Sequence, residues 1–123
     1  MPTMLEAAGL PTPERGQGDS RLGEIRRRDL GWKSPVFIEN ITQKDVDGKP
    51  AIERAMRTPG WKLILRDHPN DELYDLAHDP GEHTDLLNRP EQKTRVRELA
   101  RLIFQWGEKT NDPVAMRLAR RYA

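Results

Sequence analysis

From residue 36 onward, the spacing of apolar residues changes from short runs to a helical period. Between residues 36 and 76 the apolar side chains fall into four short runs: Val36–Ile41, Ala51–Thr58, Trp61–Arg66 and Leu73–Leu76. Residues typical of turns separate the runs: Asp47-Gly48-Lys49-Pro50, Pro59-Gly60 and the segment from Asp67 to Asp71. Such short connections favour antiparallel pairing, because parallel strands need long crossovers. The pattern therefore predicts a four-stranded antiparallel sheet over residues 36–76.

The last third of the chain has helical spacing instead. One apolar stripe follows Pro90 and contains Val96, Leu99, Ala100, Ile103 and Trp106. Gly107 is expected to end this helix, and a second apolar stripe, Ala115, Leu118, Ala119 and Tyr122, follows Pro113. We expect helices at about 90–106 and 114–122. The fold class is therefore α+β, with the long C-terminal helix laid across one face of the sheet.

The first third lacks a comparable pattern. A short helix is expected over residues 3–9, with Gly9 as its C-terminal cap. From Leu10 to Gly31, repeated glycine and proline predict an irregular loop. We therefore divide the chain into residues 1–33, a short helix and loop that lie on another surface, and residues 34–123, the sheet-and-helix subdomain.

Composition narrows the classes of function. The 123 residues include no cysteine, so the chain has neither a disulfide framework nor a thiolate metal site. The 21 Lys and Arg residues are nearly balanced by 20 Asp and Glu residues, so the net charge of the chain gives no reason to expect a nucleic-acid or membrane partner. No apolar run approaches the ~18 residues of a spanning helix. No signal peptide is readable at the start, and the compartment stays unassigned.

Loose polar clusters suggest two kinds of binding site, and both have a simpler interpretation. Asp67-His68 and Asp75 with His78 and Asp79 carry metal-ligating side chains, but on turns at these spacings a solvated loop is favoured, so no metal site is predicted. The basic clusters are Arg26-Arg27-Arg28 and Arg117, Arg120 and Arg121. Solvated surface, or pairing with acidic groups of another domain, is favoured over nucleic-acid binding.

Several other residues are assigned structural roles. Glu39 is expected to pair across the strands with Arg54 or Arg57, an interaction that contributes roughly 0.2–1 kcal/mol when partly exposed. Trp61, Tyr74 and Trp106 are interpreted as core residues that join the sheet to the helix; a cofactor role for them is disfavoured.

Four segments, in order, carry a family resemblance. The chain begins Met-Pro-Thr-Met-Leu-Glu-Ala-Ala-Gly over residues 1–9, and Gln17-Gly18-Asp19-Ser20 follows. Residues 54–64 read Arg-Ala-Met-Arg-Thr-Pro-Gly-Trp-Lys-Leu-Ile, and residues 72–86 read Glu-Leu-Tyr-Asp-Leu-Ala-His-Asp-Pro-Gly-Glu-His-Thr-Asp-Leu. Together they resemble the C-terminal portion of sulfatases of the alkaline-phosphatase-like superfamily.

The resemblance implies both a fold and a missing chemistry. In that family a small four-stranded antiparallel sheet with a C-terminal helix is attached to a large catalytic domain. The reaction uses calcium and a formylglycine made within a Cys/Ser-x-Pro-x-Arg motif. This chain has no cysteine, and neither Ser20 nor Ser34 begins the motif. No catalytic residue is therefore predicted here, and we expect no hydrolysis by the chain alone. The resemblance also implies that His68, on a loop near the pocket, contacts substrate in an intact enzyme.

The leading hypothesis is a C-terminal fragment or subdomain of a sulfuric ester hydrolase that completes the fold and substrate access of the parent enzyme. Its expected partner is a sulfatase catalytic domain or a second copy of itself, with no nucleic acid or membrane; parent enzymes are cytoplasmic or exported. One alternative is the tail of a phosphonate or phosphate-ester hydrolase of the same superfamily. The other is a free-standing protein-interaction module that uses the last helix and Arg120-Arg121.

Overall fold

The computed structural model describes residues 1–14, 18–28, 31, 34–42, 51–68 and 70–122. The chain forms two compact units, Met1–Trp32 and Lys33–Ala123. None of the helices in the described ranges is both long enough and apolar enough to cross a membrane.

The first unit contains two short helices, α1 (Pro2–Ala7) and α2 (Leu22–Arg27). Gly9 follows α1 with a φ of 69°, and this left-handed geometry ends the helix as expected. The prediction of an irregular loop from Leu10 to Gly31 is wrong at α2. The backbone N–H of Leu22 donates to Ser20 Oγ at 3.2 Å, and Glu24 in the first turn and two arginines in the last suit the helix dipole. These end effects outweigh the cost of Gly23 within the helix.

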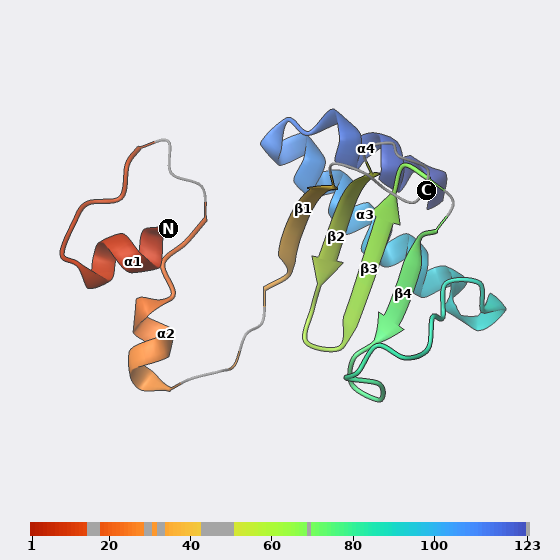
Figure 1. Cartoon of the computed structure of the whole chain (residues 1–123), viewed down its shortest axis with the longest axis horizontal. Helices are drawn as coiled ribbons and strands as arrows, with labels where there is room; N and C mark the ends of the chain where they lie inside the picture. Colours follow the sequence, from red (N-terminus) through yellow and green to blue (C-terminus); the bar gives the residue numbers. More distant parts are fainter. Residues whose placement is uncertain (15–17, 29–30, 32–33, 43–50, 69, 123) are drawn as a thin grey trace. The chain divides into compact units, whose positions relative to one another are not determined.

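The second unit is built on the predicted antiparallel sheet. Its strands are β1 (Val36–Thr42), β2 (Ala51–Arg57), β3 (Trp61–Arg66) and β4 (Glu72–Asp75), in the order β1-β2-β3-β4 (Figure 1). Thr58 closes the β2–β3 hairpin, because its Oγ1 accepts from the N–H of Trp61 at 3.0 Å. After β4 the N–H of Glu82 donates to the carbonyl of Asp79 at 3.1 Å, which forms the expected turn. The turn expected at 47–50 lies outside the described residues.

Helices cover one face of this sheet, as the sequence predicts. They are a 3₁₀ turn, η1 (Pro90–Gln92), the long α3 (Lys93–Thr110), α4 (Pro113–Ala119) and a final 3₁₀ turn, η2 (Arg120–Tyr122). In Figure 1, α3 runs behind the strands. The sheet contributes Met56, Leu63, Leu65 and Leu73 to the core, all with 0% exposure, and the helices contribute Val96, Leu99, Ala100, Ile103, Ala115, Leu118 and Ala119. Each large apolar side chain buried this way contributes roughly 1.5–3 kcal/mol.

Gly107 does not end the long helix, contrary to expectation. α3 continues to Thr110 and ends at Asn111, whose φ of 61° is left-handed. A Cβ on Gly107 would lie 3.0 Å from the Cβ of Ala115 and 3.1 Å from the carbonyl oxygen of Asp112. The glycine therefore permits the close approach of α3 and α4, and the turn to α4 is made four residues later.

The two edges of the sheet are finished differently. The N–H of Leu73 in β4 donates to Asp85 Oδ1 at 2.9 Å, and its carbonyl accepts from the N–H of Leu86 at 2.8 Å, so a loop closes this edge. Among the described residues, the outer edge of β1 has no comparable loop bonded to it. Ile38 and Ile41 on β1 are 41% and 63% exposed. The β1 edge is thus the more open side of the subdomain.

Candidate functional site

The sheet face opposite the helices carries an apolar row. Ile38, Ala55 and Ile64 are register partners across β1, β2 and β3, and strand alternation places them on the face opposite Met56 and Leu63. Ala55 and Ile64 are each 8% exposed, whereas Ile38 is 41% exposed. We call these three residues the apolar row. It is well covered at the centre of the sheet and open at β1.

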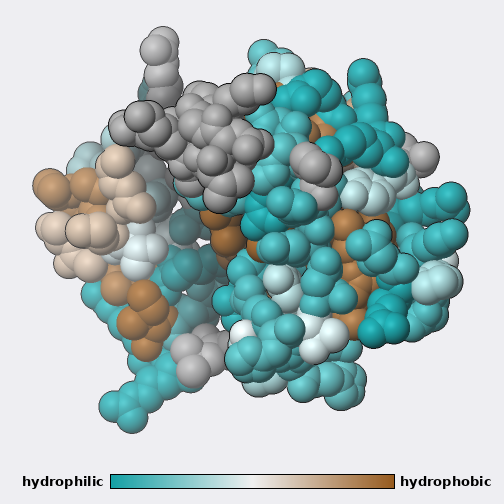
Figure 2. Space-filling model, turned by 45° about the vertical axis from the view of Figure 1, so that its right-hand side comes forward, coloured by the Kyte–Doolittle hydropathy of each residue, from teal (hydrophilic) through white to brown (hydrophobic). Residues whose placement is uncertain are grey.

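Charged pairs flank the apolar row. Arg66 Nε lies 2.6 Å from Glu53 Oε1, and Arg66 NH2 lies 3.1 Å from Glu72 Oε2. Lys62 Nζ lies 2.5 Å from Glu82 Oε2. Burial acts to raise the pKa of Glu53, but the hydrogen bonds from Arg66 and Asn40 outweigh it and lower that pKa. Figure 2, which is turned by 45° from the view of Figure 1, shows small brown apolar areas separated by teal polar groups.

A buried arginine joins the sheet to the last helix. Arg54 on β2 is 6% exposed, and its Nε lies 2.6 Å from Asp112 Oδ2. Asp112 also caps α4, since its Oδ1 accepts from the N–H groups of Val114 and Ala115. Burial opposes ionisation, yet these bonds hold the pKa of Asp112 below its usual range. The Arg54–Asp112 pair therefore locks α4 against the sheet.

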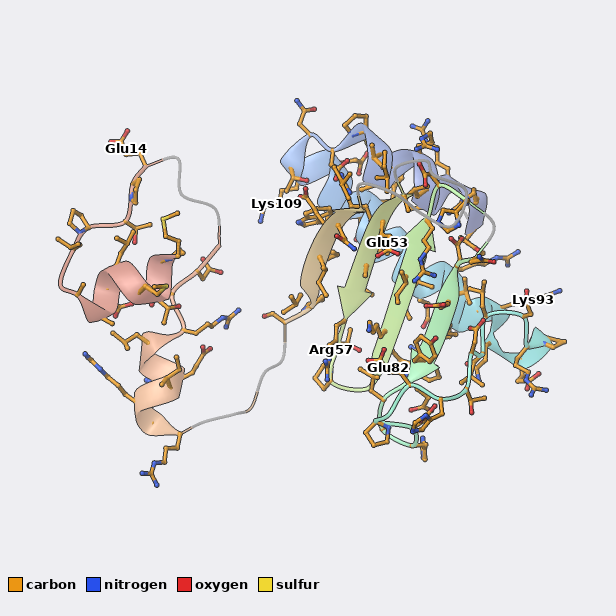
Figure 3. All side chains as sticks on the ribbon, viewed as in Figure 1. Glu14, Glu53, Arg57, Glu82, Lys93 and Lys109 are labelled. Atoms are coloured by element: carbon orange, nitrogen blue, oxygen red, sulfur yellow. The ribbon has the colours of Figure 1, made fainter. Side chains whose placement is uncertain are left out.

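Arg54 also meets its sequence-predicted partner. Glu39 and Arg54 are register neighbours, and their Oε2 and NH2 atoms are 3.9 Å apart. Glu39 is the weaker partner, because its side chain is 55% exposed and its distance is longer than that of Asp112. Arg57, the other predicted partner, is exposed on the face of the apolar row (Figure 3). How much these residues stabilise the fold stays a prediction.

A second buried carboxylate ties down the C-terminal 3₁₀ turn. Asp71 accepts from the N–H of Arg66 at 2.7 Å, from Arg121 NH2 at 3.0 Å and from the hydroxyl of Tyr122 at 2.5 Å. Burial, followed by the bond to Asp71, raises the pKa of the Tyr122 phenol. The phenol thus remains a donor, and η2 is held against the β3–β4 connection.

The aromatic residues assigned to the core divide between the two faces. Trp106 stacks on Phe37 with centroids 5.0 Å apart, and Trp61 packs beside the core with Arg95 over its ring at 5.2 Å. Tyr74, however, alternates with buried Leu73 and pairs in register with Lys62, so it lies on the open face. The expectation that Tyr74 joins the sheet to the helix is wrong, because neighbouring residues of a strand point to opposite faces.

His68 lies in the connection between β3 and β4. It is half-buried, its carbonyl accepts from the N–H of Asn70 at 2.8 Å, and its electrostatic interaction with Glu53 is among the causes that lower the pKa of Glu53. This position places it beside the charged pairs of the open face. A contact with substrate stays a prediction.

The residues present do not fit the calcium and formylglycine of sulfatases. The sequence contains no cysteine and no Ser-x-Pro-x-Arg run. In the described ranges, no group of three or more His, Asp or Glu side chains is arranged to hold a metal ion. His78 Nδ1 lies 2.9 Å from Asp75 Oδ2 on an exposed turn, and His78 lowers the pKa of Asp75. No catalytic step is therefore assigned to these side chains.

The sequence of this chain is similar to the C-terminal part of known sulfatases. The profile of the family described as N-sulphoglucosamine sulphohydrolase, C-terminal, matches residues 1–109. A delta 4,5-hexuronate-2-O-sulfatase of Bacteroides thetaiotaomicron is 26% identical over 91% of this chain and 23% of its own length. An ulvan-active sulfatase of Formosa agariphila is 23% identical over 91% of this chain and 28% of its own length.

Solved structures show the same correspondence. A protein in complex with its substrate, D-glucosamine-2-N,6-O-disulfate, superposes with a TM-score of 0.71 at 25% identity, over 91% of this chain and 24% of that one. A 2-O GAG sulfatase gives 0.69 at 27% identity, over 90% and 24%. The chain spans about a quarter of the length of these relatives. With four strands, a covering helix and a match over residues 1–109, this chain belongs to the family of sulfatase C-terminal regions represented by N-sulphoglucosamine sulphohydrolase.

Proposed function

We propose that this chain is the C-terminal subdomain of a sulfuric ester hydrolase, and that it completes the fold and the substrate access of a sulfatase catalytic domain. The proposal rests on one observation: the two faces of the sheet are covered to different extents. The helices of this chain seal one face, whereas the apolar row on the other extends to Ile38 at 41% exposure. Exposed apolar surface next to buried apolar surface favours contact with another surface.

The flanking charges fit such a contact. Arg66 is bound by Glu53 and Glu72, and Lys62 by Glu82, so these long side chains are held in place around the apolar row. A polar rim of fixed ion pairs around an apolar centre is the usual composition of an interface. Arg57, which is exposed at the end of β2, offers a further charge for pairing with acidic groups of the catalytic domain.

The names of two relatives support a proposed substrate class. The delta 4,5-hexuronate-2-O-sulfatase and the N-acetylglucosamine-6-O-sulfatase of Bacteroides thetaiotaomicron are each 26% identical to this chain, and both names describe sulfated sugars. A sulfated saccharide is therefore the proposed substrate of the complete enzyme. The catalytic domain would supply the reacting groups, since the sequence of this chain lacks the formylglycine motif.

A chimaera tests the proposal. In the hexuronate-2-O-sulfatase, the C-terminal region that matches this chain is replaced by residues 1–123, and a second form simply ends before that region. We expect the chimaera to hydrolyse an unsaturated 2-O-sulfated uronide, and the shortened form to be inactive. Ile38→Glu in the chimaera should abolish activity, because a carboxylate would be buried against the catalytic domain. The proposal is wrong if the shortened form is fully active, or if a chimaera that melts like the parent is inactive.

His68 provides a finer test of substrate access. It lies on the β3–β4 connection beside Glu53, at one end of the charged rim. In an active chimaera, His68→Ala should raise KM for the sulfated substrate without lowering the melting temperature. Unchanged KM and kcat would remove His68 from the site while leaving the subdomain role intact.

A further inference from the structure

A basic cleft lies where α3 begins. Its volume is about 350 Å³, which is within the range of small-ligand sites. Leu87 and Val96 contribute apolar surface, and Asn88 and Tyr122 contribute polar groups. The charged side chains that line it are all cationic: Arg89, Lys93, Arg97 and Arg121.

Three of these cations follow one line along the chain. Arg89 caps η1, Lys93 is the first residue of α3, and Arg97 lies one turn later. Lys93 and Arg97 are four residues apart within α3 and therefore share one side of the helix, with Cβ atoms roughly 6 Å apart, whereas Arg89 lines the cleft from the extended residue before η1. Figure 3 shows Lys93 projecting outward from the start of α3. We call Arg89, Lys93 and Arg97 the basic ladder.

The basic ladder has no acidic partner within the described residues. The neighbouring carboxylate Glu98 is used elsewhere, since its Oε2 lies 2.7 Å from Arg95 NH1. Glu91 on η1 is exposed and, in the described part of the chain, forms no ion pair with the ladder. The three charges are therefore available to a ligand.

This arrangement is costly for the helix itself. Like charges four residues apart repel one another, and cations at a helix N-terminus oppose the helix dipole. The first turn of α3 contains no acidic residue, and the acidic residue of the preceding η1 turn, Glu91, is exposed. Features that break a local rule without internal compensation are expected at functional sites. An anion in the cleft would relieve both repulsions at once.

The fourth cation is already positioned. Arg121 NH2 donates to Asp71 Oδ1 at 3.0 Å and to the carbonyl of Arg66 at 2.6 Å, and its Nε donates to the carbonyl of Leu118 at 3.1 Å. These bonds fix the guanidinium at the rim of the cleft. A ligand would lose less entropy on meeting a side chain that is already ordered.

We propose that the basic ladder and Arg121 form a binding site for the sulfate groups of a sulfated saccharide. Guanidinium groups pair with oxyanions through two parallel hydrogen bonds, and a ladder of three cations matches a ligand with several anionic groups. Asn88 and Tyr122 supply polar contacts for sugar hydroxyls. The choice of a saccharide rests on the proposed sulfatase function, whereas the preference for oxyanions rests on the cleft.

The full 123-residue chain is titrated with a heparin-derived tetrasaccharide, with an unsulfated chitin tetrasaccharide and with inorganic sulfate. We expect the sulfated saccharide to shift the amide resonances of Asn88, Lys93 and Tyr122, with an affinity that falls steeply as salt rises. Inorganic sulfate should shift the same resonances at far higher concentration, and the unsulfated sugar should shift none.

Two matched double variants distinguish binding in the basic cleft from non-specific electrostatic attraction to the chain. Lys93→Ala with Arg97→Ala should weaken binding at least tenfold. Lys109→Ala with Arg117→Ala removes the same charge outside the cleft, and should weaken binding less than threefold. Arg89→Ala, outside the regular helix, gives a single change that leaves α3 intact. The melting temperature of the Lys93 and Arg97 variant should not fall, because repulsion is removed.

Several outcomes would overturn the proposal. An equal loss in both double variants would indicate non-specific attraction, and shifts confined to other residues would place binding elsewhere. Equally tight binding of inorganic sulfate would exclude the saccharide. Because the titration measures binding by this chain and the chimaera measures hydrolysis, an active chimaera whose C-terminal region binds no saccharide would reject only the basic cleft.

Discussion

The two faces of the sheet are built from adjacent residues and have opposite roles. Leu63 and Leu65 point to the helices and are fully buried, whereas Ile64 between them belongs to the apolar row on the opposite face. On the helix side, this chain supplies both halves of the interface. On the open side the apolar row is covered at the centre of the sheet and ends at Ile38, which is 41% exposed at the β1 edge. We therefore expect the helix side to determine whether the subdomain folds, and we propose that the open side determines what it joins.

The strongest test of the helix side removes the carboxylate of Asp112. Asp112→Ala leaves the Arg54 charge buried without its closest partner and removes the cap of α4. We expect a loss of about 3–5 kcal/mol in the free energy of unfolding, measured with urea. Replacing both residues together, Arg54→Met with Asp112→Leu, should recover much of this loss. A loss below about 1 kcal/mol in the single variant would show that the pair does not hold α4.

A matched truncation compares the faces directly. Leu63→Ala opens a cavity beneath α3 and should cost about 2–5 kcal/mol. Ile38→Ala, on the open face at the β1 edge, should cost less than about 1 kcal/mol in the isolated chain, because Ile38 is 41% exposed. Chemical unfolding of both variants measures the contrast. Equal losses would mean that the open face is already sealed in this chain.

Gly107 tests how closely the helix layer is packed. In Gly107→Ala the new Cβ would meet the Cβ of Ala115 at 3.0 Å, so we expect a net loss of about 1–3 kcal/mol, despite the helix preference of alanine. Gly23→Ala in α2 serves as the control, since its nearest neighbour is the flexible end of Arg27 at 3.4 Å. An increase in melting temperature for Gly107→Ala would show that the two helices can move apart at little cost.

Acid should weaken the helix side first. The pKa of Asp112 and that of Glu53 are both lowered in the folded state, so each carboxylate stabilises the fold above the usual aspartate and glutamate range near pH 4. This contribution is lost as pH falls below that range toward the lowered values. The Asp112 side chain is 11% exposed and that of Glu53 is 23%, so we expect Asp112 to contribute more to this pH dependence. Between pH 5 and 2.5, the urea midpoint of Asp112→Asn should therefore change less with pH than that of Glu53→Gln. If the urea midpoint of Glu53→Gln changed less with pH, the ion pairs of the open face would contribute more to acid sensitivity than Asp112 does.

The sequence predicts the sheet and the long helix well, because both rest on local signals. Turn residues delimit the strands, and the apolar stripe of α3 is regular. The misassigned residues depend on context instead. Gly107 resembles a helix stop until the position of Ala115 is known, and Tyr74 resembles a core residue until strand alternation is counted from Leu73.

Long-range pairs could not be predicted from local signals. Asp112 is 58 residues from Arg54, and Asp71 is 51 residues from Tyr122. The basic ladder is different, since the four-residue spacing of Arg89, Lys93 and Arg97 is visible in the sequence. What the sequence leaves open is whether acidic side chains reach these cations, and that depends on the folded arrangement.

Asp112 both caps α4 and binds Arg54 on β2, which affects whether α4 can unfold locally. A helix of seven residues has little stability of its own and would ordinarily fray. Here the side chain that accepts from the amides of Val114 and Ala115 is also bound to β2. Those amide hydrogens should therefore exchange with solvent only when the sheet itself opens, so α4, although much shorter than α3, should report on the global unfolding of the subdomain.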